Sequence, residues 1–540
     1  MSPIVVLLLV TAVAVLLDLA LIWAWRYRKS RRMPSATSGP PPAPPRWFAA
    51  FVDRLGDLFA AARRNLRLGL AWAREDLAAS DGDRLRLSLV AACLLLNLSI
   101  GYLYADVVMV EGWQLWTWLI SSVVAVAALL PGVRPSWRWS QEASIVLGLA
   151  VVAAILRFVR LDTIPPTLHG DESLTVDFTL RHVFPPDRGT IFPFRAGLYS
   201  QPTLYNYLLW ASLRLFGENF VGLRLTSAVA GSLAILLTYF AVVQLSSRRV
   251  ALLGAAFLTT YHYHVHWSRL GLNNIWDTLW VPAILGFAAW GWANRRLGAA
   301  VVSGVALGLS QYFYSGSKIA FLLLAAWVVG RFRTQRDGRR MFAFLTRLLA
   351  ASAVIAAPIA IFVVRQPGLY FERLNRITFW QPGAGLGYER LSLEFFEAAA
   401  NQLVRAAAGF TSLTDMSGFY RPDVPLVLGL AAPLFLAGLF LASIRRSYLP
   451  VLWVALTALF GGFLLQATPA SSHYVTAIPA IAWLIGVALD AIWDHGGPWL
   501  SAGLLLAMIA TDLWFYFGVY IPGGPPPDRS LPFPTPQPPL

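Results

Sequence analysis

The stretch VGLRLTSAVAGSLAILLTYFAVVQL occupies residues 221–245 and carries a single charge, Arg224, near its start. A helix needs about 20 apolar residues to cross the roughly 30 Å of hydrocarbon in a bilayer. The stretch therefore predicts a transmembrane helix. Arg248 and Arg249 follow it directly, and such a basic pair is typical of a cytoplasmic loop.

The whole chain has the composition of a membrane protein. Of its 540 residues, 57% are hydrophobic and 13% are charged, with a mean hydropathy of +0.59, whereas about a quarter of an average soluble domain is charged. The net charge is +15, but the arginines lie in small clusters at the ends of apolar segments, which argues against a nucleic-acid partner. The single cysteine, Cys93, lies in an apolar segment and excludes an intrachain disulfide.

Similar apolar stretches recur along the chain and predict an all-α polytopic bundle of about 14 spans. We place these near residues 3–25, 87–107, 115–131, 144–160, 221–245, 250–267, 276–294, 297–313, 319–332, 345–364, 425–444, 449–466, 475–493 and 498–520. With the N-terminus outside, five separate basic clusters fall in cytoplasmic loops, as the positive-inside rule requires. They are Arg134 with Arg138, Arg248 with Arg249, Arg295 with Arg296, the run from Arg331 to Arg340, and Arg445 with Arg446.

The chain divides into five parts. Residues 1–33 predict an N-terminal transmembrane helix, and residues 34–86 a Pro-rich linker followed by a cytoplasmic amphipathic segment. That segment either lies on the inner leaflet or is a plain tether. Residues 87–143 predict two additional transmembrane helices, residues 144–520 the main membrane domain, and residues 521–540 a Pro-rich external tail.

Two long loops face outward in this topology, residues 161–220 and 365–424. Within the first, residues 203–216 predict a juxtamembrane helix lying along the membrane surface, because counting them as a span would break the charge pattern. Neither loop resembles a separate folded domain.

The first outer loop carries the motif His169-Gly-Asp171-Glu172 soon after a span ends. Adjacent acids in an irregular loop can divide their roles, one accepting a proton while the other positions it or binds a polar group of the substrate. The motif is a candidate for acid-base chemistry, but a solvated loop carboxylate is the simpler interpretation of the pair by itself.

The chain resembles the GT-C glycosyltransferases that use polyprenyl-phosphate sugars, a group that contains protein O-mannosyltransferases and aminoarabinose transferases. The resemblance covers about residues 144–520, so that this part is expected to be a GT-C-like helical bundle with outer-face loops. Its motifs, in chain order, are Arg160-Leu161 through His169-Gly-Asp-Glu172, Gln201-Pro-Thr-Leu-Tyr-Asn-Tyr-Leu208, Val221 to Gly231, Trp267-Ser-Arg269 and Tyr312-Phe-Tyr-Ser-Gly-Ser-Lys318.

The resemblance implies that Asp171 is the general base and that Glu172 assists it or contacts the acceptor. A lipid-linked sugar keeps its phosphate at the headgroup level, so that cations at the outer ends of helices are needed beside the acid. Arg269 and Lys318 are predicted to bind this donor phosphate, with helix-end snorkelling as the alternative. Arg224 either joins them or forms a salt bridge with a loop acid such as Glu218.

Other motif residues are predicted to line the substrate pocket: His169, Gln201, Tyr205, Tyr314, His473 and Tyr474. Three positions depart from the relatives. Gln201 stands where Lys or His is common, Leu174 where the aminoarabinose branch has Arg, and His473-Tyr474 where an Arg-Tyr pair is common. These departures put aminoarabinose in doubt as the donor sugar and leave the general chemistry in place.

The metal requirement is left open by the sequence. His262 and His266 lie four residues apart on one helix face, a spacing known from zinc sites. Because no acid completes the set and Tyr261, Tyr263 and Trp267 surround it, we favour an aromatic belt at the membrane interface. No metal ligand or cofactor is assigned, and a divalent metal remains an open alternative.

The function expected is an inverting glycosyltransferase of the plasma membrane, with its site on the non-cytoplasmic side and membrane lipids around it. Its partners are a polyprenyl-phosphate-linked sugar and a lipid, glycan or protein acceptor. One alternative is a transporter or flippase of lipid-linked sugars, which usually has polar residues on broken helices at mid-membrane. Another is an envelope glycan polymerase or ligase that uses outer-loop arginines such as Arg373 and Arg376.

Overall fold

The computed structural model describes residues 81–130, 141–186, 189–335, 337–378, 392–415, 420, 424–466 and 468–523. The predicted helix at residues 3–25, the linker with most of the amphipathic segment, the cluster of Arg134 and Arg138, and nearly all of the external tail lie outside these residues. The long helices are α3 (Asp81–Tyr104), α4 (Trp113–Leu129), α5 (Gln141–Phe158), α8 (Phe220–Leu245), α9 (Arg248–Thr260), α11 (Asp277–Ala293), α12 (Leu297–Leu309), α13 (Ala320–Gln335), α14 (Gly338–Arg365), α17 (Ala431–Ile444), α18 (Tyr448–Thr457), α20 (Ile478–Gly496) and α21 (Pro498–Leu513).

Shorter elements connect these helices, most of them at one end of the bundle. They are β1 (Met109–Val110), α6 (Gly170–His182), β2 (Thr190–Ile191), η1 (Leu198–Ser200), α7 (Leu204–Phe216), α10 (His262–Ser268), η2 (Asn273–Trp276), η3 (Ser310–Tyr312), η4 (Ser315–Ile319), α15 (Pro367–Ile377), α16 (Leu393–Ala408), η5 (Ala458–Phe463), α19 (Ser471–Tyr474), η6 (Val475–Ala477) and η7 (Trp514–Tyr520). β1 and β2 pair antiparallel, with Met109 opposite Ile191.

The protein is a helical membrane protein, although the count of about 14 spans is not confirmed. Each span predicted from residue 87 onward coincides with a helix or with successive helical segments. Six helices of the described part are long and apolar enough to cross a bilayer. They cover residues 85–104, 220–245, 315–335, 338–365, 471–496 and 498–520.

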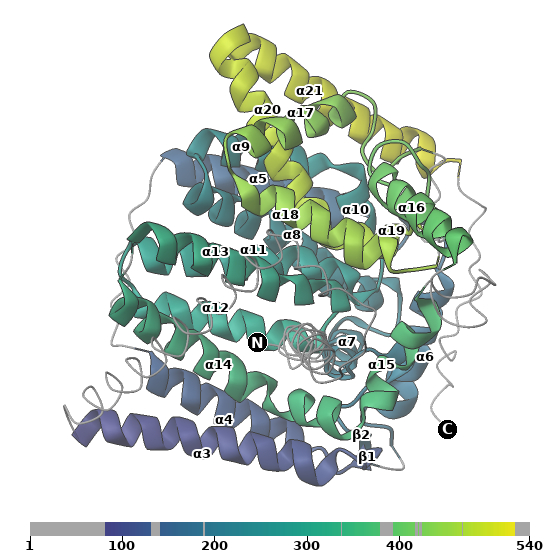
Figure 1. The fold of residues 1–540 in the computed structure, drawn as a ribbon. Helices are drawn as coiled ribbons and strands as arrows, with labels where there is room; N and C mark the ends of the chain where they lie inside the picture. Colours follow the sequence, from purple (N-terminus) through teal and green to yellow (C-terminus); the bar gives the residue numbers. More distant parts are fainter. Residues whose placement is uncertain are drawn as a thin grey trace, which may run out of the picture.

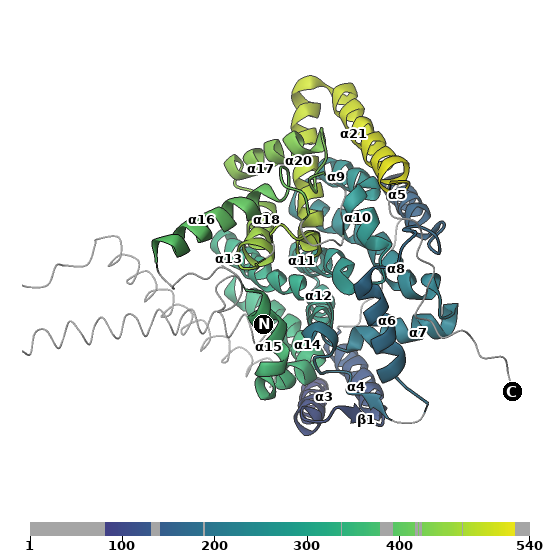
Figure 2. The same cartoon turned by 90° about the vertical axis from the view of Figure 1, so that its right-hand side faces the viewer.

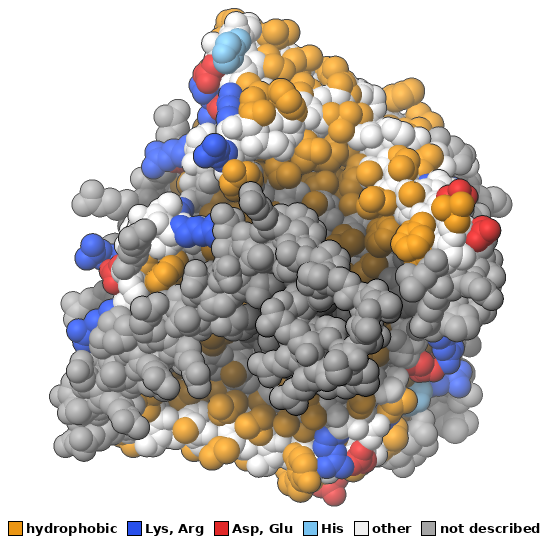
Figure 3. All heavy atoms as spheres, viewed as in Figure 1, with side chains coloured by type: hydrophobic (Ala, Val, Ile, Leu, Met, Phe, Trp, Pro, Cys, Tyr) orange, Lys and Arg blue, Asp and Glu red, His pale blue; other side chains and the backbone are white. Residues whose placement is uncertain are grey.

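The long helices run roughly side by side, and their two ends differ (Figure 1). α6, α15 and α16 all lie on the right of that view, and Figure 2, which faces this side, shows α6 beside α7 among the helix ends. In the face shown in Figure 3, Lys and Arg side chains gather along the left edge and occur with Asp and Glu at the right, and most coloured side chains between these edges are apolar. This distribution is the one expected when charges lie at the two membrane surfaces.

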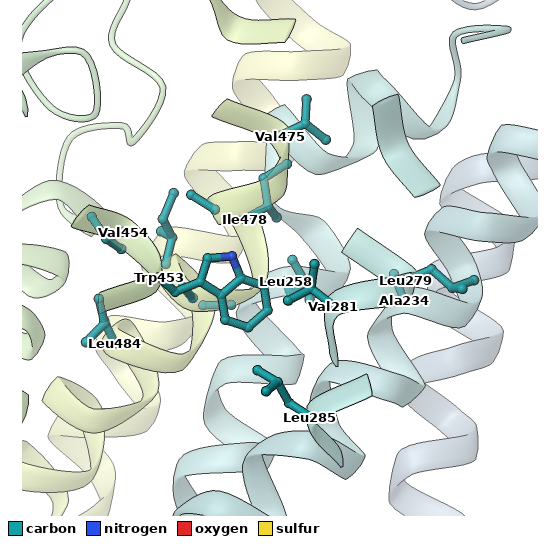
Figure 4. Close-up of a cluster of buried hydrophobic side chains, with 14 of the residues drawn as sticks. Ala234, Leu258, Leu279, Val281, Leu285, Trp453, Val454, Val475, Ile478 and Leu484 are labelled. Atoms are coloured by element: carbon teal, nitrogen blue, oxygen red, sulfur yellow. The ribbon is translucent and has the colours of Figure 1, made fainter. Parts of the chain in front are cut away.

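Most of α20 is buried inside the bundle. Trp453 of α18 packs there among Leu258, Val281, Leu285 and Ile478, which come from three other helices (Figure 4). The Trp453 indole donates a hydrogen bond to the Thr476 carbonyl at 2.7 Å. The polar atom of this large side chain is therefore satisfied inside the core, as buried tryptophans usually require.

Two local predictions have definite outcomes. Residues 203–216 form a helix, α7, which packs on α6 and α8. The aromatic belt expected around His262 and His266 is wrong, because both side chains are buried, with 0% and 2% exposed. His266 stacks on the Tyr420 ring at 4.3 Å, so that the segment packs inside the protein and does not face lipid headgroups.

Candidate functional site

The start of α6 places Asp171 at one end of the bundle. His169 is the N-cap residue, and its ring accepts a hydrogen bond from the Asp171 amide at 3.1 Å. Glu172 completes the capping box by accepting from the His169 amide at 3.0 Å. Such reciprocal bonds satisfy amide groups that have no partner inside the helix. The motif His169-Gly-Asp-Glu172 therefore fixes the first turn of α6 and the position of Asp171.

Glu172 has a structural role that differs from the catalytic role expected for it. Its side chain is fully buried and pairs with Arg224 of α8 at 3.1 Å. The same carboxylate accepts the Gly271 amide at 2.6 Å. Arg224 also donates to the carbonyls of Pro165 and Thr167, both at 2.9 Å. Glu172 thus joins α6 to α8 and to the turn after α10.

Asp171 faces a group that the sequence did not single out. The Tyr199 hydroxyl donates to Asp171 Oδ1 at 2.9 Å, and the Arg373 guanidinium of α15 lies 4.6 Å from the centre of the Tyr199 ring. Burial, then the hydrogen bond to Asp171 and its negative charge, raise the pKa of Tyr199 to about 12. Tyr199 therefore stays a proton donor at neutral pH.

The backbone around Tyr199 is strained. Tyr199 and Ser200 have φ angles of 54° and 56°, a left-handed conformation that costs non-glycine residues on the order of 1–3 kcal/mol. The Ser200 hydroxyl accepts the Arg373 amide at 3.3 Å. Such strain persists where surrounding contacts hold it, and here it brings η1 against α15.

A small pocket opens at this position, with a volume of about 50 Å³. Its lining includes Asp171, Tyr199, Gln201, Tyr205 and Tyr314. Burial raises the pKa of Tyr205 to about 12. Further polar lining comes from Asn273, Asn274, Arg373 and Ser472. The pocket thus combines one carboxylate, one guanidinium and several neutral polar groups, a set suited to a hydroxyl-rich ligand with a negative charge.

Lys318 is a second cation near this pocket, after Arg373, but it does not line the pocket. Lys318 Nζ donates to Ser315 Oγ at 3.2 Å and lies 5.7 Å from the centre of the Tyr370 ring. Tyr370 and Arg373 are three residues apart on α15, so that they share one face of that helix. No carboxylate of the described residues forms a salt bridge with Lys318 or Arg373.

Other predicted site residues have structural partners. Arg269 is buried and donates to the carbonyls of Leu156, Val159, Arg160 and Ile164, where it caps the carboxyl end of α5. His473 bonds the Tyr314 hydroxyl at 2.7 Å, and the Tyr474 hydroxyl donates to the Ala406 carbonyl at 2.8 Å. Neither Arg224 nor Arg269 lines the pocket. The salt bridge considered for Arg224 forms with Glu172, while Glu218 pairs with Arg214.

Sequence reasoning missed Tyr199 and named Arg373 only for the polymerase or ligase alternative. The signal available was weak, because Arg373 lies more than 200 residues after Asp171 and beside the similar Arg376. Among the described residues, no group of three His, Cys, Asp or Glu side chains could hold a metal ion.

Part of this chain matches a known protein family. Residues 200–362 match the family model for dolichyl-phosphate-mannose-protein mannosyltransferase. The match contains Gln201, Tyr205, Tyr314 and Lys318. It confirms the resemblance to GT-C glycosyltransferases over that segment. The comparison with curated proteins gave no match.

Two solved structures are similar to this chain. The archaeal oligosaccharyltransferase AglB from Archaeoglobus fulgidus, in complex with an inhibitory peptide and a dolichol-phosphate, has 16% sequence identity and a TM-score of 0.47. The alignment covers 71% of this chain and 55% of AglB, so that this chain spans about half the length of AglB. ArnT from Cupriavidus metallidurans, bound to undecaprenyl phosphate, has 19% identity and a TM-score of 0.48, with 69% of this chain and 64% of ArnT covered.

Proposed function

We propose that this membrane protein, which matches the mannosyltransferase family model over residues 200–362, is a glycosyltransferase that uses a polyprenyl-phosphate-linked sugar. The acceptor hydroxyl binds at Asp171 on the non-cytoplasmic side. The observation that carries the proposal is the pocket in which Asp171 and Arg373 lie on either side of Tyr199. Transfer from a lipid carrier needs a base and a cation at the headgroup level, and the pocket supplies both.

The proposed reaction is one displacement. The Asp171 carboxylate takes the proton of the acceptor hydroxyl while its oxygen attacks the anomeric carbon. The bond from that carbon to the phosphate oxygen breaks, the polyprenyl phosphate leaves with the electron pair, and the anomeric centre inverts. Arg373, with Lys318 behind Tyr370, stabilises the charge that develops on the phosphate. Tyr199 holds the Asp171 carboxylate in place through its hydroxyl.

The test is the substitution Asp171→Asn in the purified full-length protein. The amide cannot accept the proton, so that we expect sugar transfer to fall by at least about 100-fold, the lower range for general-base catalysis. The measurement is product formation from a polyprenyl-phosphate sugar, with donor translocation across proteoliposomes measured separately. Asp177→Asn is the control, because Asp177 lies on the same helix and pairs with Arg181 at the surface.

Two outcomes would contradict the proposal. Near-normal transfer by Asp171→Asn would remove the carboxylate from the mechanism. Translocation of the donor without any transfer by the unaltered protein would favour the flippase alternative.

A further inference from the structure

The two helices α3 and α4 precede the segment that matches the mannosyltransferase family, and they pack tightly against α14 of that segment. Pro358 lies inside α14 and has no amide hydrogen to donate to Val354. Asn97 of α3 donates to the Val354 carbonyl at 2.8 Å instead, and a Cβ atom at Gly101 would lie 2.8 Å from Pro358 Cα. The proline in α14 and the small and polar residues of α3 thus fit one another.

The same two helices also hold the loop that carries the candidate site. The strand after α3, β1, pairs with β2 in the first outer loop. Trp118 of α4 packs on Phe194 at 5.2 Å and donates to the Ile355 carbonyl at 2.9 Å. Arg365 at the end of α14 pairs with Asp106. α3 and α4 are therefore integral to the outer end of the bundle.

A second pocket lies between α3 and α14 and has a volume of about 300 Å³, within the usual size range of ligand pockets. Leu94 and Leu98 of α3 form one wall, and four alanines of α14 with Phe321 form much of the rest. The α14 residues of this lining run from Ser352 to Val363, about 16 Å along a helix. That length is about half the hydrocarbon thickness of a bilayer.

The end of this pocket at Tyr370 lies near the pocket that contains Asp171. Tyr370 belongs to its lining, and the Lys318 ammonium lies against the Tyr370 ring. Arg373, one turn further along α15, lines the pocket of Asp171. An apolar pocket beside two cations that form no salt bridge with a carboxylate of the described residues fits a ligand with an apolar chain and an anionic head.

We propose that α3 forms a wall of the binding site for the isoprenyl chain of the phosphate carrier, with Leu94 and Leu98 in contact with the chain. This inference rests on the proposed function for the identity of the lipid. It assigns a substrate-binding role to residues 81–129, which lie before the family match. The phosphate end lies at Lys318 and Arg373, and the chain runs along α14 into the outer leaflet.

The experiment is photolabelling of the full-length protein in nanodiscs with a long-chain polyprenyl phosphate that carries a benzophenone on its chain. We expect labelled peptides from residues 85–104 and 352–363. Leu98→Trp fills the pocket and should lower this labelling at least fivefold. Leu95→Trp is the matched control, because Leu95 is 63% exposed and does not line the pocket; its labelling should stay unchanged.

Competition distinguishes the carrier from bulk lipid. Unlabelled polyprenyl phosphate should displace the probe, whereas phosphatidylglycerol at the same concentration should not; equal competition by both would overturn the proposal. Labelling of the unaltered protein that avoids both peptides would also overturn it, whether or not Leu98→Trp folds.

Photolabelling needs no sugar transfer, so that it separates the two proposals. If the protein is labelled at α3 but transfers no sugar, the result contradicts the proposed function alone. If the protein transfers sugar but is not labelled at α3, the result contradicts the proposed role of α3 alone.

Discussion

At the scale of single residues, the charged side chains near the candidate site fall into two groups. Some line the pocket, and others are paired inside the protein. Asp171 and Arg373 line the pocket, and Tyr199 contacts both of them. Arg224 and Arg269 are fully buried, and their guanidinium groups donate to Glu172 and to backbone carbonyls. If such a buried guanidinium turned to a ligand, it would leave buried acceptors unpaired. Of these three arginines, Arg373 is the one that lines the pocket, and we therefore propose it as the phosphate ligand.

Arg373→Ala should lower kcat/KM for the lipid-linked sugar by about 10- to 150-fold, since one hydrogen bond to a charged group is worth about 1.5–3 kcal/mol. Arg376→Ala is the control on the same helix, because Arg376 is exposed and pairs with Glu372. The measurement is the initial rate of transfer at several donor concentrations. Equal losses in the two variants would show that only the general charge of α15 matters.

At the scale of elements, α6 is held by one buried ion pair. Glu172 and Arg224 come from α6 and α8, and both side chains are fully buried. Replacing two charges by apolar groups can be neutral, but removing one partner leaves the other buried and uncompensated. Because Asp171 precedes Glu172 directly, the pair that stabilises α6 also positions the candidate base.

Glu172→Gln should therefore destabilise the protein by about 3–5 kcal/mol. Glu218→Gln is the matched control, because its partner Arg214 is half exposed and such a surface pair contributes at most about 1 kcal/mol. The measurement is thermal unfolding in detergent. Glu172→Gln with Arg224→Gln should cost less than the two single changes together, and additive losses would argue against the pairing.

At the scale of the whole molecule, the charges at the helix ends predict the position of the site relative to the membrane. α6, α7 and α15 gather at one end of the bundle (Figure 2). The turns that carry Arg248, Arg295 and Arg445 directly follow α8, α11 and α17. A basic excess in these turns indicates the cytoplasm.

The side can be tested in a Cys93→Ser background, because Cys93 is the only cysteine. A membrane-impermeant maleimide should label Asp177→Cys in intact cells, since Asp177 lies on α6 and is partly exposed. Arg446→Cys, in the turn between α17 and α18, should be labelled only after lysis. The reverse pattern would place the pocket in the cytoplasm.

The sequence by itself determined the helices of the membrane domain and the residue at the centre of the candidate site. Apolar runs and the arginines behind them are local properties, so that segments such as residues 221–245 could be located without knowledge of their neighbours. The motif around Asp171 was equally local, but the prediction of an irregular loop there is wrong, because Gly170–His182 form the helix α6.

Only the tertiary structure decided which charges are available to a ligand. Arg224, Arg269 and Arg373 are equivalent cations in the sequence, but the first pairs with a carboxylate 52 residues away and the second caps a helix more than 100 residues before it. Arg373 reaches the pocket through Tyr199, across 174 residues. The reason is physical: burial and pairing depend on which distant segments pack together, and no local pattern records that.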